Sequence, residues 1–390
     1  MDFSYILTDY VTLISLILMA VAFIMLAIYY GLFFFRVGHY GKRKKTKKID
    51  ANAQNSSVND EKLPPVSIVL VAHNEGYWLR DNLVYLLEQD YPNFEVVVVD
   101  YKSTDDTRFI LQVCSENYHH LNCVRMDQDV NMFRGKKYPL SIGIRSAKND
   151  VIMLTDSDCK PIGFDWLRQM VKGYNKSNTQ IVLGYCGINQ SKGLLNLLQQ
   201  YDNLHYSAHY LGNALLKHPT TATGRNLSYR RSYFFERGAF IRHYSQPYGA
   251  DDLFVNQNAK SSNTNISIAE DAFVMMDAKR NFAEWHLMRK LRIITDSLHP
   301  FGERLSACIY PINIVVFYVS WLFLLLTNRF PWEILVGIMA LKFTWQIITE
   351  NQLSKRFKVK FVQWLSPIFE IYFLIANTIL RILPLPKNRM

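Results

Sequence analysis

Two carboxylates follow an apolar run in a position where they could hold a divalent cation. Asp156 and Asp158 come directly after VIMLT, residues Val151–Thr155. In α/β sheets, ligands gather in the turns at the carboxyl ends of strands. A carboxylate pair there can bind a cation together with a diphosphate, and hard oxygen ligands select Mg²⁺ or Mn²⁺. Because acidic turn residues are also common without a ligand, the triplet Asp156-Ser157-Asp158 must be interpreted from its surroundings.

Two further charged motifs lie nearer the C-terminus. Asp251 and Asp252 precede Leu253, where they could also cap a helix and fill its first turn. Arg289 and Arg292 are three residues apart, so a helix would place them on one face. Their guanidinium groups could meet a diphosphate or an acceptor there. The alternative is an amphipathic helix at a membrane surface, whose cations contact lipid phosphates.

The elements that must position these residues alternate between strands and helices. Val66–Ala72, Glu95–Asp100 and Val151–Thr155 are short, nearly continuous runs of apolar, mostly β-branched residues. Such runs are typical of strands that are buried on both faces of a parallel sheet. Helical patterns occupy the intervals at Tyr77–Gln89 and Asp105–Tyr118. The alternation predicts an α/β fold built from βαβ units.

Several motifs follow one another in a fixed order between about Val66 and Arg292. They are VSIVLVAHNEG (Val66–Gly76), VVVVDYKSTDDT (Val96–Thr107), Gly135-Lys136 with Leu140 and Gly143-Ile144, DVIMLTDSDCKP (Asp150–Pro161) and GRNLSYR (Gly224–Arg230). In this order they resemble the motifs of the family 2 glycosyltransferases. Two details differ from the family pattern. Ala72 stands where Pro is usual, and Tyr101-Lys102 replaces an Asp-Gly pair.

This resemblance implies a GT-A fold, which is a Rossmann-like α/β domain with a mostly parallel sheet. It also implies inverting transfer from a nucleotide-sugar, with a UDP-sugar expected. The metal, Mg²⁺ or Mn²⁺, is assigned to Asp156 and Asp158. The donor-binding residues that it indicates are Ala72, Asn74, Glu75, Asp100, Lys136, Asp156, Ser157, Arg289 and Arg292.

The resemblance also indicates a catalytic base. In the family, the Asp of an acidic pair ahead of a Leu deprotonates the acceptor hydroxyl. Here that residue is Asp251 or Asp252, with Asp252 slightly favoured. The family's Q/R-x-x-R-W element corresponds to Arg289 and Arg292, although Ile293 stands where Trp is expected.

Apolar stretches at both ends of the chain predict membrane helices. Val11–Phe35 is long enough to cross a hydrocarbon core of about 30 Å. A signal peptide is not expected here, because residues 1–9 before the stretch contain no Lys or Arg and no small-residue cleavage site follows it. The last stretch contains Pro367 and Glu370, so it is expected either to span the membrane or to be re-entrant or interfacial. Leu194–Tyr210 is interpreted as an interfacial helix. The three C-terminal stretches are about Ala307–Leu326, Ile334–Ile348 and Phe361–Leu383.

Basic segments predict the orientation in the membrane. Gly41–Lys48 carries six basic residues in eight, and Lys355–Lys360 carries four. By the positive-inside rule both segments are cytoplasmic, so the N-terminus lies outside. The position of the first segment beside a membrane helix favours contact with anionic lipids over nucleic acid, which is not expected as a partner. Five cysteines without a CxxC pair fit a reducing compartment.

We therefore expect an integral protein of a bacterial-type inner (cytoplasmic) membrane with its catalytic domain in the cytoplasm. The predicted regions are an N-terminal anchor at 1–40, a basic segment and linker at 41–65, a GT-A domain with interfacial helices at 66–300, and transmembrane or re-entrant helices at 301–390.

A membrane lipid or a lipid-linked glycan is the expected acceptor, because few membrane helices leave little room for a polysaccharide channel. One alternative is a processive polysaccharide synthase of the same family. From a different class, the chain could be a catalytically silent membrane scaffold that retains the fold. The intact acidic pairs at Asp156/Asp158 and Asp251/Asp252 argue against a scaffold.

Overall fold

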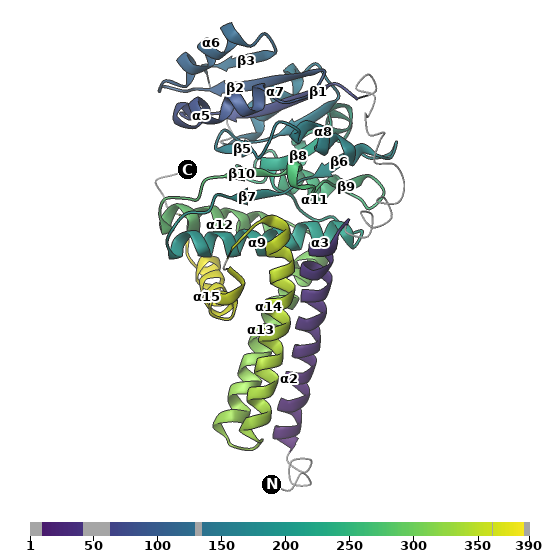
Figure 1. Ribbon diagram of the computed structural model, residues 1–390, viewed down its shortest axis with the longest axis vertical. Coiled ribbons are helices and arrows are strands. Elements are labelled where there is room, and N and C mark those ends of the chain that lie inside the picture. Colours follow the sequence, from purple (N-terminus) through teal and green to yellow (C-terminus); the bar gives the residue numbers. More distant parts are fainter. Residues whose placement is uncertain (1–9, 42–62, 129–134, 361, 386–390) are drawn as a thin grey trace. The chain divides into compact units, whose positions relative to one another are not determined.

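The computed structural model describes residues 10–41, 63–128, 135–360 and 362–385. The chain divides into two compact units (Figure 1). We call Lys44–Leu298 with Pro384–Met390 the sheet unit, and Met1–Arg43 with His299–Leu383 the helical unit. Most of the predicted basic segment and linker, residues 42–62, lies outside the described residues.

A seven-stranded sheet forms the centre of the sheet unit, in the order β3-β2-β1-β4-β8-β6-β9. Strands β3, β2, β1 and β4 are parallel, whereas β8 runs antiparallel to both of its neighbours. The bounds are β1 Val66–Ala72, β2 Phe94–Tyr101, β3 Leu121–Met126, β4 Val151–Leu154, β6 Ile181–Leu183, β8 Leu227–Arg230 and β9 Thr264–Ile266. The predicted α/β fold with a mostly parallel sheet is therefore confirmed.

Helices cover both faces of the parallel part of the sheet. Ile68 of β1 packs in one core with Leu79 of α5, while the alternate residue Val69 faces α7 on the other side. Helix α7 comes so close that a Cβ on its Gly143 would lie 2.8 Å from methyl groups of Val69 and Val99. The helices that connect the parallel strands are α5 Gly76–Leu87, α6 Thr107–Asn117 and α7 Lys137–Ser146.

A second, three-stranded sheet in the same unit has the order β5-β10-β7. Strand β10 is antiparallel to β5 and parallel to β7. These strands have three residues each, which is too short for a recognisable sequence period. Their bounds, and those of the remaining helices, are β5 Cys159–Pro161, β7 Cys186–Ile188, β10 Val274–Met276, α8 Trp166–Val171, α9 Leu194–Leu215, α10 Arg231–Glu236, α11 Asp252–Asn258 and α12 Phe282–Asp296.

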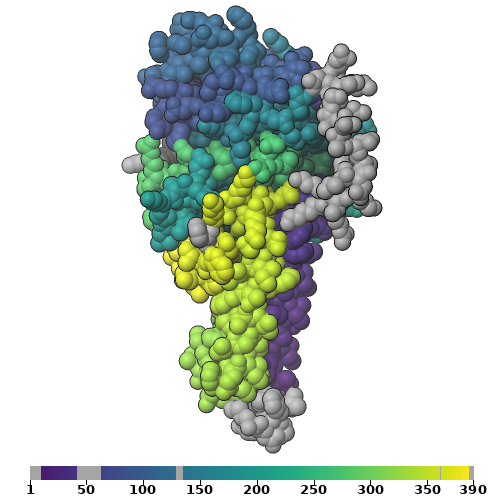
Figure 2. Space-filling model, in the orientation of Figure 1, coloured from purple at the N-terminus to yellow at the C-terminus, as the bar shows by residue number. Residues whose placement is uncertain are grey.

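Within the described residues, four helices are long and apolar enough to cross a membrane, one near the N-terminus and three near the C-terminus. The first runs without a break through α2, η1 and α3, and Met19 and Ala22 of α2 pack against Phe317 of α13. Much of α14 and part of α13 lie on the face in Figure 2, and their exposed side chains include Val319, Leu322 and Leu341. The bounds are α2 Tyr10–Tyr29, η1 Tyr30–Phe35, α3 Arg36–His39, α13 Phe301–Leu326, α14 Trp332–Phe357 and α15 Val362–Ile382.

A buried polar cluster joins these helices. Glu370 of α15 forms an ion pair with Lys342 of α14, and both side chains are at most 3% exposed. The Glu370 carboxylate also accepts hydrogen bonds from the hydroxyls of Tyr30 (3.1 Å), Tyr310 (3.3 Å) and Tyr318 (2.9 Å). In Figure 1, α15 is viewed nearly along its axis while α13 and α14 stand upright, so α15 lies across them. The polar residue that distinguished this stretch in the sequence therefore points into the helical unit.

Candidate functional site

The turn after β4 carries the Asp156-Ser157-Asp158 triplet and is tied to the turn after β1. The Ser157 hydroxyl donates a hydrogen bond to the carboxylate of Glu75. The side-chain amide of Asn82 donates to the Ser157 carbonyl oxygen at 2.9 Å. Because β1 and β4 are adjacent and parallel, Glu75 and the triplet meet at the carboxyl edge of the sheet.

The other predicted donor-binding residues of this edge lie at the ends of β1 and β2. Ala72 and Asp100 are register partners, and Asp100 is buried with the Arg108 Nε 3.7 Å from its carboxylate. Asn74 has a positive φ of 56°, and its side-chain oxygen accepts the Thr104 N–H at 2.7 Å. The structure therefore brings Ala72, Asn74, Glu75, Asp100, Asp156 and Ser157 to one edge of the sheet.

Three cations surround the two carboxylates of the triplet. Lys136 lies 2.9 Å from Asp156, and Lys279 lies 3.1 Å from Asp158. Arg225 lies between the carboxylates, 3.5 Å from Asp156 and 3.7 Å from Asp158. Two carboxylates suit a hard divalent cation, and the surrounding ammonium and guanidinium groups suit phosphate oxygens.

These neighbours keep both carboxylates charged. Burial raises the pKa of Asp158, but Arg225 and Lys279 outweigh burial and lower this pKa to about 2. Burial also opposes ionisation of Asp156, and Lys136 with Arg225 brings its pKa below the usual value. The pKa of Glu75 is raised, because burial outweighs the effects of Lys136 and Ser157. The donor set of Asp156 and Asp158 therefore fits a divalent metal at neutral pH.

The position of Lys279 depends on a buried side chain of α9. The Gln199 side-chain oxygen accepts the backbone N–H of Lys279 at 2.8 Å, and its amide donates to the Lys279 carbonyl at 2.9 Å. This pair of bonds fixes the backbone from which the Lys279 ammonium reaches Asp158.

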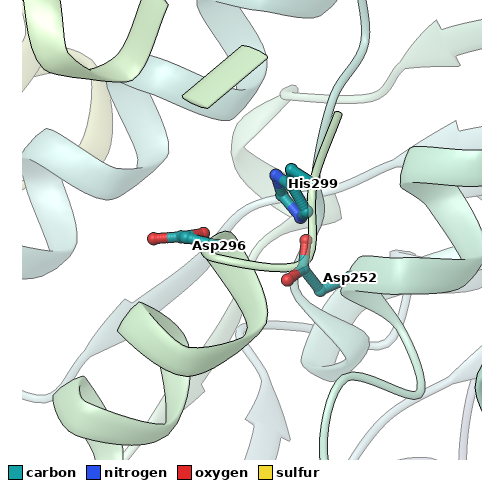
Figure 3. A group of neighbouring side chains, drawn as sticks. All are labelled: Asp252, Asp296 and His299. Carbon is teal, nitrogen blue, oxygen red and sulfur yellow. The ribbon is translucent and has the colours of Figure 1, made fainter. Parts of the chain in front are cut away.

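The second acidic pair stands at the start of α11. The Asp251 carboxylate accepts the backbone N–H of Gly224, the residue before Arg225. Asp252 is buried, and its carboxylate accepts the Thr221 hydroxyl. A carboxylate oxygen of Asp252 also lies within 4.8 Å of one of Asp296, at the end of α12 (Figure 3). Segment 221–225 thus connects the acidic pair to the Asp156/Asp158 cluster.

The two residues of this pair differ in their environments. Asp251 is partly exposed, whereas Asp252 is 6% exposed. Burial and the neighbouring charge of Asp252 raise the pKa of Asp251 above its ordinary value. A partly exposed carboxylate with a raised pKa is a stronger proton acceptor than an ordinary Asp.

Arg289 and Arg292 of α12 have a carboxylate partner on α9. Their guanidinium groups lie 3.3 Å and 3.5 Å from the Asp202 carboxylate, and Arg289 is buried. Arg292 also stacks over the ring of Tyr206, 3.9 Å from its centroid. The Tyr206 hydroxyl in turn lies 3.4 Å from the Thr221 hydroxyl that donates to Asp252. The two arginines therefore join α9 to α12, and Arg292 is connected to the acidic pair through Tyr206 and Thr221.

Two cations of the site were missed in the sequence. Arg225 stands inside the GRNLSYR motif, and its charge could have marked it as a partner for Asp156 and Asp158. Lys279 belongs to no motif, and 121 residues separate it from Asp158. The contact between Lys279 and Asp158 arises from the packing of α9 against the loop after β10.

Comparison with known proteins identifies the domain. Residues 67–238 match the model of glycosyl transferase family 2. The probable glycosyltransferase YdaM of Bacillus subtilis is 33% identical over 105 residues, which are 26% of this chain and 25% of that protein. A poly-β-1,6-N-acetyl-D-glucosamine synthase of Staphylococcus epidermidis is 32% identical over 93 residues, 24% of this chain and 21% of the synthase.

A solved mannosyltransferase from Pyrobaculum calidifontis, in complex with GDP-mannose and Mn²⁺, has a similar fold. The match has a TM-score of 0.57 at 18% identity and covers 93% of this chain and 98% of that one. The chain thus carries a family 2 glycosyltransferase domain with a GT-A-like fold, as the motifs predicted. The segments matched in the two curated relatives span only about a quarter of their lengths.

Proposed function

We propose that this chain moves a sugar from a nucleotide-sugar to a hydroxyl of a membrane lipid or a lipid-linked glycan, with inversion at the anomeric carbon. The observation that carries the proposal is the cluster of Asp156 and Asp158 with Lys136, Arg225 and Lys279 at the carboxyl edge of the sheet. Charged carboxylates for a metal and cations for a diphosphate stand together there, as transfer from a nucleotide-sugar requires.

Each group of residues has a separate role in this proposal. Asp156 and Asp158 hold Mg²⁺ or Mn²⁺, and a bound cation there would offset the charge that builds on the leaving diphosphate. Lys136, Arg225 and Lys279 bind the diphosphate oxygens. Ala72, Asn74, Glu75 and Asp100, with Ser157, hold the nucleoside and sugar. The Mn²⁺ and GDP-mannose bound by the Pyrobaculum enzyme support this assignment, while the nucleotide of this chain's donor, expected to be UDP, remains a proposal.

We assign the base to Asp251. It is the more exposed member of the pair, and the raised pKa suits it to accept the proton of the acceptor hydroxyl. Attack by that hydroxyl on the side opposite the diphosphate inverts the anomeric carbon in one step. Asp252, held by Thr221, then acts as a neighbour that fixes the start of α11. Arg289 and Arg292, with Asp202, support the acceptor side by fixing α12 against α9.

The acceptor is proposed from the four apolar helices, which would hold the sheet unit near a membrane surface. A processive polysaccharide synthase is the second candidate, and it is favoured by the partial match to the poly-β-1,6-N-acetyl-D-glucosamine synthase. A panel of nucleotide-sugars with native lipid extract tests both. Release of nucleotide with a single-sugar lipid product supports the first function, and a long polymer supports the second.

We predict that transfer requires a divalent metal. Asp156→Asn or Asp158→Asn should abolish transfer, because each change removes a charged oxygen ligand. The purified variants should retain their circular dichroism spectra and lose Mn²⁺ binding in calorimetry. Asp90→Asn is the control, since the Asp90 side chain is 78% exposed and its ion pair lies outside the site. Full activity in excess chelator would refute the metal requirement.

We predict that the N-terminus and the loop between α13 and α14 face the outside of a bacterial-type inner membrane, with the sheet unit in the cytoplasm. In a cysteine-free background, Arg329→Cys should react with an impermeant maleimide on intact cells. Lys360→Cys should react only after permeabilisation. Both side chains belong to exposed parts of the loops that flank α14. The reverse pattern would exclude the orientation and, with it, a cytoplasmic supply of donor.

A further inference from the structure

Lys137 is a buried cation to which none of the sequence motifs assigns a role. It is the first residue of α7 and is 3% exposed. Its ammonium donates hydrogen bonds to the carbonyl oxygens of His243 at 2.7 Å and Gln246 at 2.8 Å. A charged side chain is costly to bury unless its donors are satisfied, so these two bonds tie α7 firmly to segment 243–246.

A second contact joins the same two segments. Gly135 has a φ of +112°, and a Cβ placed on it would lie 2.1 Å from the carbonyl oxygen of Pro247. Only glycine fits both this backbone conformation and this approach. Residues 135–137 therefore lie against 243–247 at two points, one polar and one steric.

Segment 243–247 leads directly into the acidic pair. Gly249, with a φ of +73°, turns the chain, and Asp251 follows two residues later. The charges of Asp251 and Asp252 both act on Lys137. On the other side, the preceding residue Lys136 contacts Asp156 at 2.9 Å. Of two consecutive lysines, Lys136 thus contacts the Asp156/Asp158 cluster, and Lys137 binds the segment that leads to Asp251 and Asp252.

We infer that Lys137 is a positioning residue that holds the segment carrying Asp251 in register with the donor-binding cluster. Lys136 contacts Asp156 in the donor-binding cluster. Lys137 holds the segment before the proposed base by donating to the carbonyl oxygens of His243 and Gln246. A displacement of about 1 Å at a reacting group can cost on the order of 100-fold in rate. This inference rests on the proposed role of Asp251 as the base.

The electrostatic environment makes this role dependent on pH. Burial lowers the pKa of Lys137 to about 8, and Asp251 and Asp252 act in the opposite direction. His243 is neutral at working pH, because burial and Lys137 lower its pKa to about 4. As pH rises through about 8, Lys137 loses the charge that strengthens its bonds to the two carbonyls, so turnover should decline there.

The test compares variants of the two lysines. Lys137→Met should lower kcat on the order of 100-fold with donor affinity nearly unchanged, whereas Lys136→Met should weaken donor affinity. Lys137→Gln keeps a donor without the charge and covers the case in which the Met variant fails to fold, which thermal unfolding would reveal. Lys137→Arg keeps donors and charge, so it should recover turnover and hold it above pH 8.

Three results would overturn the inference. They are unchanged kcat in both folded neutral variants, a loss of donor affinity equal to the loss of kcat, and the same alkaline decline in Lys137→Arg as in the wild type. Failure of the proposed function is distinguishable, because the wild type would then transfer no sugar in the panel of nucleotide-sugars and lipid extract. Full transfer in Asp251→Asn would refute only the assignment of the base. An inactive Asp251→Asn with fully active Lys137 variants would reject the positioning role alone.

Discussion

Asp251→Asn is expected to reduce sugar transfer by about two to four orders of magnitude, the usual size of a general-base contribution. The amide cannot accept the proton of the acceptor hydroxyl, although it keeps an oxygen that can accept the Gly224 N–H. Donor affinity should be nearly unchanged, because the proposed function assigns donor binding to Asp156, Asp158 and the surrounding cations. Calorimetry with the donor and a product assay measure the two effects separately.

Asp252→Asn is the matched control. Its side chain can still accept the Thr221 hydroxyl, so a clearly smaller loss of transfer is expected. If Asp252→Asn is inactive while Asp251→Asn retains transfer, the base is Asp252. Wild-type transfer in both variants would remove the pair from the mechanism and would favour a silent scaffold or a base elsewhere.

The pH profile gives a second measurement on the same residue. The deprotonated carboxylate is the active form of a base, so activity is lost as pH falls through its pKa. Burial and Asp252 raise the pKa of Asp251, and the acidic decline of kcat/KM should therefore lie at higher pH than an ordinary Asp would give. An Asp252→Asn variant removes one of these two causes and should move the decline to lower pH.

The second large effect concerns the ion pair inside the helical unit. Lys342→Met leaves the Glu370 carboxylate without its cationic partner, at a site where Glu370 is 2% exposed. Removing one member of a buried pair costs about 3 to 5 kcal/mol of stability. The midpoint of unfolding in detergent micelles should fall accordingly. In a membrane, charged side chains are rare because each is costly unless it is paired.

The double variant Lys342→Met/Glu370→Leu should recover most of the loss, because it replaces both charges with apolar groups. Ile375→Ala is the control on the outward face of α15, where Ile375 is 56% exposed. If Lys342→Met destabilises no more than this control, the pair does not hold α15 on the other helices. The product assay measures separately whether Lys342→Met changes sugar transfer.

Local patterns were enough to predict the central part of the fold. The runs at β1, β2 and β4 were recognisable because strands buried on both faces are continuously apolar, and the observed bounds differ from the predicted ones by at most one residue. Helices α5 and α6 followed from their periodicity. The four helices that are long and apolar enough to cross a membrane were also predicted, because an apolar stretch of sufficient length is a property of the sequence alone.

The antiparallel strand β8 and the small sheet β5-β10-β7 were not predicted. Three- and four-residue strands carry too few positions for a period to show, and their pairing depends on segments far apart in the chain. Strand β10, for example, pairs Val274 with Cys186 and Pro161. These additions matter because β10 leads to Lys279 and β8 follows Arg225.

The sequence by itself determined which residues could do chemistry, because a DxD triplet after a strand and an acidic pair before a helix are local patterns. Only the tertiary structure decided their partners. Arg225 is 69 residues from Asp156 in the chain, and Lys279 is 121 residues from Asp158. Lys137 is more than 100 residues from His243 and Gln246, whose carbonyl oxygens it binds. Asp202 holds Arg289 in the same way. Such ion pairs form when the packing of helices and loops brings charged side chains from distant parts of the chain together, and packing is a property of the whole fold.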